Sequence, residues 1–373
     1  MRTFFKVMLT TASLLTPSAL ALGSGVASAA ITIAYVSPHG SPARPDTSCK
    51  TAGFSSINKA IGAVSAGGTV VVCRGTYRTQ VVIRKPLSLE GLRGAVIDAT
   101  GQKPVPGLPV PGGSGVVVLA TRHVLVAGFT VVNAGFDAIL VARSTRVRVR
   151  SNILLRNGDV GVDFNGTSFS VADHNTARYN AGGGFLVTDA MGRSSFDAFT
   201  ANEASLNPGG SGVIVAGHST AGVTHNLIED NFLVFNGRSR RSPGAGVVIA
   251  TEVPHETVAD NTVADNTIFL NGLAGVIIHA HVNAQHMHGN RIIGNTIGTN
   301  NTIGDPVGLG APVTDKPDRR TTGIVIGASS RIKVLISRND IYKNFYGIFI
   351  EGRVRAVLHR NLFHLVVVHI KFA

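Results

Sequence analysis

Asn152-Ile-Leu-Leu-Arg-Asn157 is followed, 23 residues later, by Asn175-Thr-Ala-Arg-Tyr-Asn180. Two asparagines with this spacing recur five more times, as Asn202/Asn207, Asn231/Asn236, Asn266/Asn271, Asn295/Asn300 and Asn339/Asn344. A glycine and a short apolar run follow most pairs, as in Gly161-Val162 and Gly184-Phe185. A repeat of this length is typical of solenoids, and short apolar runs bounded by Asn and Gly predict strands. The sequence therefore predicts a β-solenoid.

Stacked parallel strands lie about 4.8 Å apart, so equivalent side chains of successive coils form columns. Interior asparagines can hydrogen-bond to one another along such a column and satisfy the polar groups at the turns. We therefore interpret the recurring asparagines as part of the scaffold and not as sugar-binding residues.

The first residues have the pattern of a secretory signal. Arg2 and Lys6 precede an apolar stretch that runs to about Leu22, and small residues follow at Ala27-Ser28-Ala29. We expect residues 1–29 to be removed, residues 30–78 to form a cap and residues 79–373 to form the solenoid. No later run is long enough to span a bilayer, so the expected location is extracellular.

The net charge is +13, and it becomes +11 when Arg2 and Lys6 of the signal are subtracted (13 − 2 = 11). Such a charge suits a polyanionic partner, and an acidic polysaccharide is the partner that we expect. Nucleic acid is disfavoured, because aromatic residues make up only 6% of the chain and tryptophan is absent.

The cap is expected to contain a short helix and a disulfide. Ser55 or Ser56 can N-cap an amphipathic helix that ends at Gly67-Gly68. Cys49 and Cys73 are the two cysteines of a chain that we expect to be secreted, so a disulfide is the expected pairing. A loop of this length would contribute about 3 kcal/mol on the chain-entropy estimate.

Two insertions, at 237–245 and 301–322, fall between the second asparagine of a pair and the next strand. They are expected to project from the same edge of the solenoid and to wall a groove. Their basic residues, together with Arg193 and His279, are the expected substrate-binding residues; the insertions supply Arg240, Arg241, Arg319 and Arg320.

The segment Phe54-Ser-Ser-Ile-Asn-Lys-Ala-Ile61, followed by Gly-Gly-Thr-Val-Val-Val-Cys-Arg-Gly-Thr-Tyr77, resembles the opening of secreted right-handed parallel β-helix proteins. The later Asn/Gly coils are similar to the carbohydrate-binding and sugar-hydrolase repeats of the pectate-lyase-like superfamily. The resemblance implies an all-β, single-stranded right-handed parallel β-helix with a short N-terminal capping helix. Lyases, hydrolases, epimerases and a copper-site maturation factor share this fold, so the resemblance does not select an activity.

Motifs of the active families are mostly missing. Gly217-His218-Ser219 and Arg331-Ile332-Lys333 resemble two polygalacturonase motifs, but no matching Asp-Asp or Asn-Thr-Asp accompanies them. The Asp-Pro-His-Asp signature of alginate epimerases and a calcium-binding cluster of acids like that of pectate lyases are also absent from the sequence. No cofactor is required by the sequence, although a divalent metal such as calcium could bind.

Aligning the coils on the glycine before each strand predicts a column of polar residues just past the strand ends. The column contains Asp189, His218, Glu252 and His281, which we expect on the outer surface within roughly 5–10 Å of their neighbours. Imidazoles and carboxylates so placed can transfer protons or hold a metal ion. These four are the expected catalytic residues. Weaker candidates are Asp137, Asp159, Asp163, His174 and His225. The cluster His281, His286 and His288 is a candidate metal site.

Two reactions fit this column. In a lyase, a base removes the proton next to a uronate carboxylate while a cation neutralises that carboxylate. In an inverting hydrolase, two carboxyls flank a water, and Asp189 and Glu252 would stand about 9.6 Å apart from strand spacing alone. A non-catalytic carbohydrate-binding or surface protein is the competing class, and a metal-handling factor is a third. The sequence leaves the polymer, the reaction and the oligomeric state open.

Overall fold

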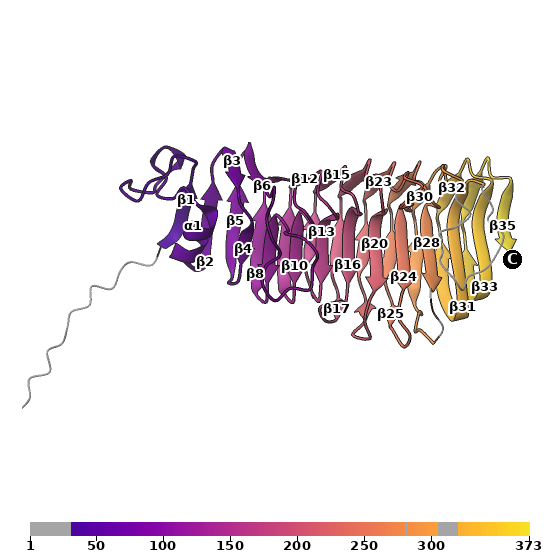
Figure 1. Ribbon diagram of the computed structural model, residues 1–373. Coiled ribbons are helices and arrows are strands. Elements are labelled where there is room, and N and C mark those ends of the chain that lie inside the picture. The colour runs from indigo at the N-terminus through magenta and orange to yellow at the C-terminus, as the bar shows by residue number, and fades with distance from the viewer. Residues whose placement is uncertain (1–30, 281, 283, 305–319) are drawn as a thin grey trace, which may run out of the picture. The chain divides into compact units, whose positions relative to one another are not determined.

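The computed structural model describes residues 31–280, 282, 284–304 and 320–373. The expected signal at 1–29 lies outside them, as do His281 and Arg319. Residues Ile31–Ala373 form one compact unit in which parallel strands stack into three walls (Figure 1). Nearly every element of the described residues is a strand, and their one α-helix is short and lies near the start. The predicted parallel β-helix with a capping helix is confirmed.

The first wall carries the apolar runs that follow the asparagine pairs. In stacking order it consists of β4 (Val81–Ile83), β7 (Val116–Leu119), β10 (Ile139–Ala142), β13 (Val160–Asn165), β16 (Gly183–Thr188), β20 (Ser211–Gly217), β24 (Val247–Thr251), β28 (Val276–Ala280), the first part of β31 (Thr322–Ser337), the first part of β33 (Tyr346–His359) and β35 (Val368–Phe372).

The second wall follows the first in each coil. It consists of β1 (Ile31–Val36), β2 (Val64–Val72), β5 (Leu87–Gly91), β8 (Arg122–Ala127), β11 (Thr145–Arg150), β14 (Val171–Asp173), β18 (Ala198–Thr200), β22 (Leu227–Glu229), β26 (Thr262–Ala264), β29 (Asn290–Ile293) and the later parts of β31 and β33.

The third wall closes each coil. It consists of β3 (Gly75–Arg78), β6 (Ala95–Asp98), β9 (Thr130–Val132), β12 (Ile153–Leu155), β15 (Thr176–Arg178), β19 (Glu203–Ser205), β23 (Phe232–Val234), β27 (Thr267–Phe269), β30 (Thr296–Ile297), β32 (Asp340–Tyr342) and β34 (Leu362–His364). Between the first and second walls, β17 (Ser194–Ser195), β21 (Val223–Thr224) and β25 (Val258–Ala259) form a small parallel ladder.

The start of the unit is closed by the helix α1 (Ile57–Ala63) and a 3-10 turn at Cys49–Thr51. The side chain of Ser56 accepts a hydrogen bond from the Lys59 N–H and caps the helix, which buries Ile57, Ala60 and Ile61. The predicted end at Gly67-Gly68 is wrong, because the backbone is already extended at Val64 and β2 begins there. The predicted Cys49–Cys73 disulfide is confirmed.

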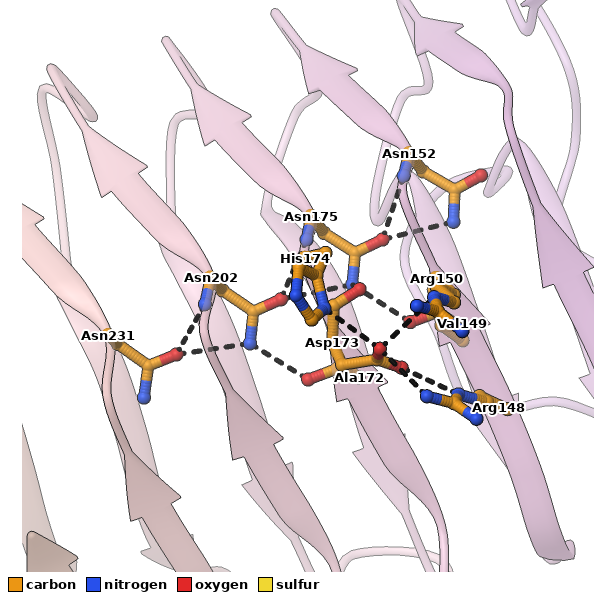
Figure 2. A network of polar contacts seen from close by, with 10 residues as sticks. All are labelled: Arg148, Val149, Arg150, Asn152, Ala172, Asp173, His174, Asn175, Asn202 and Asn231. Atoms are coloured by element: carbon orange, nitrogen blue, oxygen red, sulfur yellow. Dashed lines mark hydrogen bonds and ion pairs between the residues drawn. The ribbon is translucent and has the colours of Figure 1, made fainter.

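The predicted asparagine columns are confirmed as two buried ladders, one along each side of the third wall. In the first ladder, Oδ1 of Asn175 accepts from both the backbone N–H and the side-chain amide of Asn152, each at 3.0 Å. The pattern repeats through Asn202 and Asn231 (Figure 2). It continues as far as Asn361. The second ladder runs from Asn157 to Asn344.

The residue before each ladder asparagine turns the chain. The backbone angle φ lies between 52° and 56° at five of these residues, which are Ser151, His174, Ala201, Asp230 and Asp265. This left-handed conformation costs a non-glycine residue roughly 1–2 kcal/mol. The hydrogen bonds of the ladder offset that cost, since they satisfy the backbone groups exposed by the bend.

The inward side chains of all three walls form one continuous apolar core. The outer face of the first wall is partly covered as well, because Val105 and Leu108 of the excursion at 101–114 pack on Leu119 and Leu140. The outer ends of the later first-wall strands are therefore where polar side chains can reach solvent. In the described part of the chain, no helix is long and apolar enough to cross a membrane.

Candidate functional site

The turns after first-wall strands β16, β20 and β24 carry the predicted polar column, and the structure divides it into buried and exposed members. His218 and Glu252 are exposed, whereas Asp189 is completely buried. The prediction that Asp189 lies on the outer surface is therefore wrong. His281 lies outside the described residues, so its place in the column stays a prediction.

Asp189 is buried because the next coil folds over it. Its carboxylate accepts the backbone N–H groups of His218 at 2.7 Å, Ser219 at 2.9 Å and Gly222 at 2.6 Å. The Ser219 hydroxyl adds a further hydrogen bond of 2.9 Å. Four donors leave little capacity for a substrate, so the geometry assigns Asp189 the role of holding the 218–222 turn that presents His218.

The His218 imidazole is held between two partners. Its Nδ1 lies 2.8 Å from the Thr188 hydroxyl, and its Nε2 lies 3.4 Å from a carboxylate oxygen of Glu252. The hydrogen bond to Glu252 is the main reason why the pKa of His218 is raised above its usual 6.5. His218 and Glu252 thus form a solvent-accessible acid–base pair.

Glu256 is a buried carboxyl beneath this pair, and sequence reasoning missed it. Its Oε2 accepts the backbone N–H groups of Glu252 at 2.7 Å and Val253 at 3.0 Å, while its Oε1 is buried without a hydrogen-bond partner. Burial raises the pKa of Glu256 to about 7. Glu256 is the second carboxylate, after Asp189, that fixes a turn of the column. Its place in an irregular loop leaves no periodic signal.

A second group of buried carboxyls lies on earlier coils. Asp163 lies on β13 with Leu140 and Leu186 as its register partners, and it is only 2% exposed. Burial is the largest cause that raises the pKa of both Asp163 and Asp137. The positive charge of His218 acts in the opposite direction and lowers the pKa of Asp163. The buried carboxyl and the exposed pair therefore interact electrostatically.

A groove of about 610 Å³ runs along the same edge of the solenoid, on the coils before His218. Arg122 and Arg143 line it, both exposed, and none of the described residues in its wall is an Asp or Glu. The remaining lining is Pro86, Ala120, Thr121, Ser144, Thr145, Gly166, Ser168 and Met191. Met191 belongs to the same turn as Asp189 and follows Thr188, the hydroxyl partner of His218, by three residues.

The predicted substrate-binding cations are not all near His218. Arg193 is, since its Nε donates to the carbonyl of Ala221 in the 218–222 turn at 3.2 Å. Arg240 and Arg241 precede β24, whereas Glu252 follows it, so they lie at the opposite end of the strand. Arg320 likewise precedes β31 and stacks on Phe345 at 4.0 Å.

His279 is buried in β28, at 5% exposure. Strand register places it on the outward column that also contains Thr188, Ala216 and Ala250. Among the described residues, no group of three or more His, Cys, Asp and Glu side chains is arranged to hold a metal ion. His286 and His288 are described and form no such group.

Solved structures with this arrangement of coils include several that act on polysaccharides. An alginate lyase from Paenibacillus sp. str. FPU-7 has 13% identity and a TM-score of 0.60, over 80% of this chain and 96% of that one. Pectate lyase Pel9A has 18% identity and a TM-score of 0.58, over 88% and 79%. PfbA, a surface adhesin of Streptococcus pneumoniae, has 14% identity and a TM-score of 0.57, over 85% and 87%.

Identities this low establish a common fold and nothing more specific. No curated protein matches the sequence. Residues 111–364, which comprise most of the coils, match the family model described as "Right handed beta helix region". With the parallel three-walled coils and the asparagine ladders, this match shows that the chain belongs to the right-handed β-helix family.

Proposed function

We propose that the protein binds an acidic polysaccharide in the groove lined by Arg122 and Arg143 and cleaves it by elimination at His218. The observation that carries the proposal is the position of the exposed His218–Glu252 pair beside a cationic groove on one edge of the solenoid. Neither element alone would distinguish an enzyme from a binding protein.

The groove has the chemistry that a uronate chain needs. Arginine presents a planar fork of donors that matches a carboxylate, and no Asp or Glu of the described residues lines the groove beside Arg122 and Arg143. The Thr121 hydroxyl can hydrogen-bond to a sugar hydroxyl. The hydroxyls of Thr145 and Ser168 already donate to the Ser168 carbonyl and to Thr145, so they can serve a sugar as acceptors. The groove measures several hundred cubic ångströms, the usual range for a small-ligand site.

His218 supplies the proton transfer. An arginine that neutralises the uronate carboxylate acidifies the neighbouring C–H, and a base can then remove that proton. A raised pKa makes the deprotonated imidazole a stronger base, and Glu252 stabilises the imidazolium that forms. In this elimination a C=C bond forms as the C–O bond to the leaving sugar breaks, and the leaving oxygen takes up a proton from the imidazolium or from water. The reaction therefore needs one base, a cation for the carboxylate and this returned proton. The two-carboxylate hydrolysis with Asp189 is less well supported, because four hydrogen bonds already occupy the Asp189 carboxylate.

A non-catalytic binding protein is the second candidate, and one observation favours it. Both ring nitrogens of His218 have partners in the resting structure, so the imidazole must release Thr188 or Glu252 before it can act as a base. In this alternative the same cationic groove retains the polymer without chemistry.

Secretion is part of the proposal. The disulfide between Cys49 and Cys73 supports an oxidising compartment, where such bonds persist. The signal pattern around Arg2 and Lys6 lies outside the described residues. Expressing the full chain in cells and assaying the culture medium for the protein would test its export directly.

The activity is tested on polygalacturonate and alginate, with unsaturated products followed by ultraviolet absorbance and new reducing ends measured in parallel. Wild-type protein should form unsaturated ends, His218→Ala should abolish their formation, and Arg122→Ala/Arg143→Ala should raise KM. Lys59→Ala/Arg93→Ala, which removes two exposed cations from other surfaces, is the matched control. Reducing ends without unsaturated products would refute elimination, and retention without cleavage would favour the binding protein.

A further inference from the structure

Strands β31 and β33 lie at the opposite end of the solenoid from the cap (Figure 1). Their later parts carry four exposed cationic residues, Arg331, Lys333, Arg353 and Arg355. Lys333 and Arg355 are register partners on adjacent parallel strands. Arg331 and Arg353 precede them by two residues, and both line one groove with Arg355. All four are exposed, because they alternate with residues such as Ile332 and Val334, which point into the core.

This arrangement works against the stability of the fold. Like charges directly opposite on neighbouring strands are destabilising, and strand spacing brings Lys333 and Arg355 within about 5 Å at the backbone. Within the described part of the chain, no carboxylate forms an ion pair with any of the four. The repulsion is therefore not neutralised by the protein itself.

The earlier coils of the same wall show the contrast. Arg148 and Arg150 also project outward from β11, but Asp173 on the next coil pairs with them at 2.8 and 3.3 Å (Figure 2). There the sequence supplies a carboxylate for its cations. On β31 and β33 it supplies none, which is what a site for an external anion requires.

The surface around these cations is shaped. Arg331, Arg353 and Arg355 line a groove of about 460 Å³. Lys333 lines a second groove of about 430 Å³ together with His288 and Arg291. One side of this second groove is apolar, because Leu335 and Val357 are register partners and both contribute to its lining.

The cationic residues and the neighbouring apolar surface of Leu335 and Val357 together indicate the class of ligand. A sugar acid has a carboxylate on its edge and C–H groups on its ring face, so a uronate chain can use both surfaces. A phosphate polymer would gain nothing from Leu335 and Val357. Apart from His288, the lining of the two grooves offers no aromatic ring on which a nucleic-acid base could stack.

We infer that β29, β31 and β33 carry a second binding site for acidic polysaccharide, separate from the groove at Arg122 and Arg143. The inference rests on the proposed ligand class and does not depend on the proposed chemistry at His218. Two sites on one rigid stack of coils would hold a long polymer at two points, so that its release from one does not free it.

Calorimetric titration with a short oligogalacturonate tests the inference. The wild-type protein should bind at two sites, and Arg353→Ala/Arg355→Ala should lose one of them, with affinity there reduced at least about tenfold. Arg122→Ala/Arg143→Ala should lose the other. Lys59→Ala/Arg93→Ala removes the same charge elsewhere and should retain both. The melting temperature of Arg353→Ala/Arg355→Ala should not fall, because the substitution relieves repulsion.

Each outcome decides between the two proposals. If Arg353→Ala/Arg355→Ala binds like the Lys59→Ala/Arg93→Ala control, the second site is refuted whatever His218 does. If that site persists while no polymer is cleaved, the proposed chemistry fails alone. Leu335→Ser should weaken oligogalacturonate binding and leave inorganic polyphosphate binding unchanged. If polyphosphate bound as tightly as the oligogalacturonate, and Leu335→Ser did not weaken oligogalacturonate binding, the proposed ligand class would be overturned.

Discussion

A Cβ atom added to Gly217 would stand 1.1 Å from Oε1 of Glu256, so the buried carboxyl of one coil rests directly on the backbone of the coil before it. Glu256 also accepts hydrogen bonds from the N–H groups of Glu252 and Val253. Its contact with Gly217 therefore fixes the distance between the turn that carries Glu252 and the coil before it. A side chain at position 217 would displace the acid–base pair from below.

Gly217→Ala should therefore destabilise the protein and disturb the site. Overpacking of this kind costs about 1–3 kcal/mol, and the Glu256 carboxyl has nowhere to move without losing its hydrogen bonds. Thermal denaturation measures the loss. Gly62→Ala is the control, since a Cβ there meets nothing within 4 Å and alanine favours the helix α1. Equal melting temperatures for the two variants would show that Glu256 does not occupy the described position.

Glu252→Gln should lower the pKa of His218. The hydrogen bond to Glu252 is the largest cause of the raised value, so its charge stabilises the imidazolium. The stabilisation from this pair is present below the usual pKa of 6.5 and is lost as the pH rises through the raised value. An NMR titration of the imidazole in both proteins measures the change, with Glu229→Gln as the control. An unchanged titration curve in Glu252→Gln would mean that the pair does not form in solution.

Asp197→Asn should stabilise the protein at neutral pH. Asp197 is buried at a ladder position, where its Oδ1 accepts the Ser170 N–H at 2.8 Å as an asparagine would. Burial raises its pKa from 3.8 to about 7, so the folded protein retains a proton that the unfolded chain loses. The free energy of unfolding of the wild-type protein should consequently fall as the pH rises from 3.8 to about 7.

Denaturant unfolding of both proteins across that range measures the difference, which should be absent at acid pH and largest near pH 7. Asp230→Asn, at an exposed position, should leave the pH dependence of the wild type unaltered. If Asp197→Asn and wild type show parallel pH profiles, Asp197 is ionised in the fold and the prediction fails.

Asn231→Ala should cost more than Asn361→Ala. Both oxygens accept from the asparagine of the preceding coil in the same way, yet Asn231 is buried mid-ladder and Asn361 is partly exposed on the last coil. Removing Asn231 breaks the hydrogen bonds from the Asn202 N–H and the Asn202 amide and the one to the Phe199 carbonyl. The Asn202 amide keeps the Ala172 carbonyl, so the buried Asn202 N–H is the donor left without this partner, at about 1–3 kcal/mol. Chemical denaturation compares the variants, and equal losses would argue that the ladder adds no stability.

The ladders were predictable because the amino-acid type itself repeats at a fixed offset. A third ladder, Asn226 to Asn261 to Asn290, was missed although its signal is present, since each member stands five residues before a predicted one. Extending the five-residue spacing backwards would have found it. The disulfide and the capping helix also follow from local chemistry and were predicted.

The site was harder to predict because its residues occupy irregular turns. Counting along the chain places Asp189, His218 and Glu252 at equivalent positions, but it cannot indicate that the 218–222 turn closes over Asp189. It also treats every insertion as if it lay on the edge that carries the site. Arg240 and Arg241 show the error, because β24 separates them from Glu252.

The bends before the ladder asparagines bear on how such a protein changes over time. Chemically unrelated side chains occupy equivalent bends, as His174, Ala201, Asp230 and Arg338 do, and all adopt the same backbone conformation. The ladder asparagines hydrogen-bond to main-chain N–H and carbonyl groups and to one another. These bonds do not involve the side chain of the residue at the bend. Substitutions at the bends can therefore change the side chains that the coils present to solvent while the hydrogen bonds of the interior stay as they are.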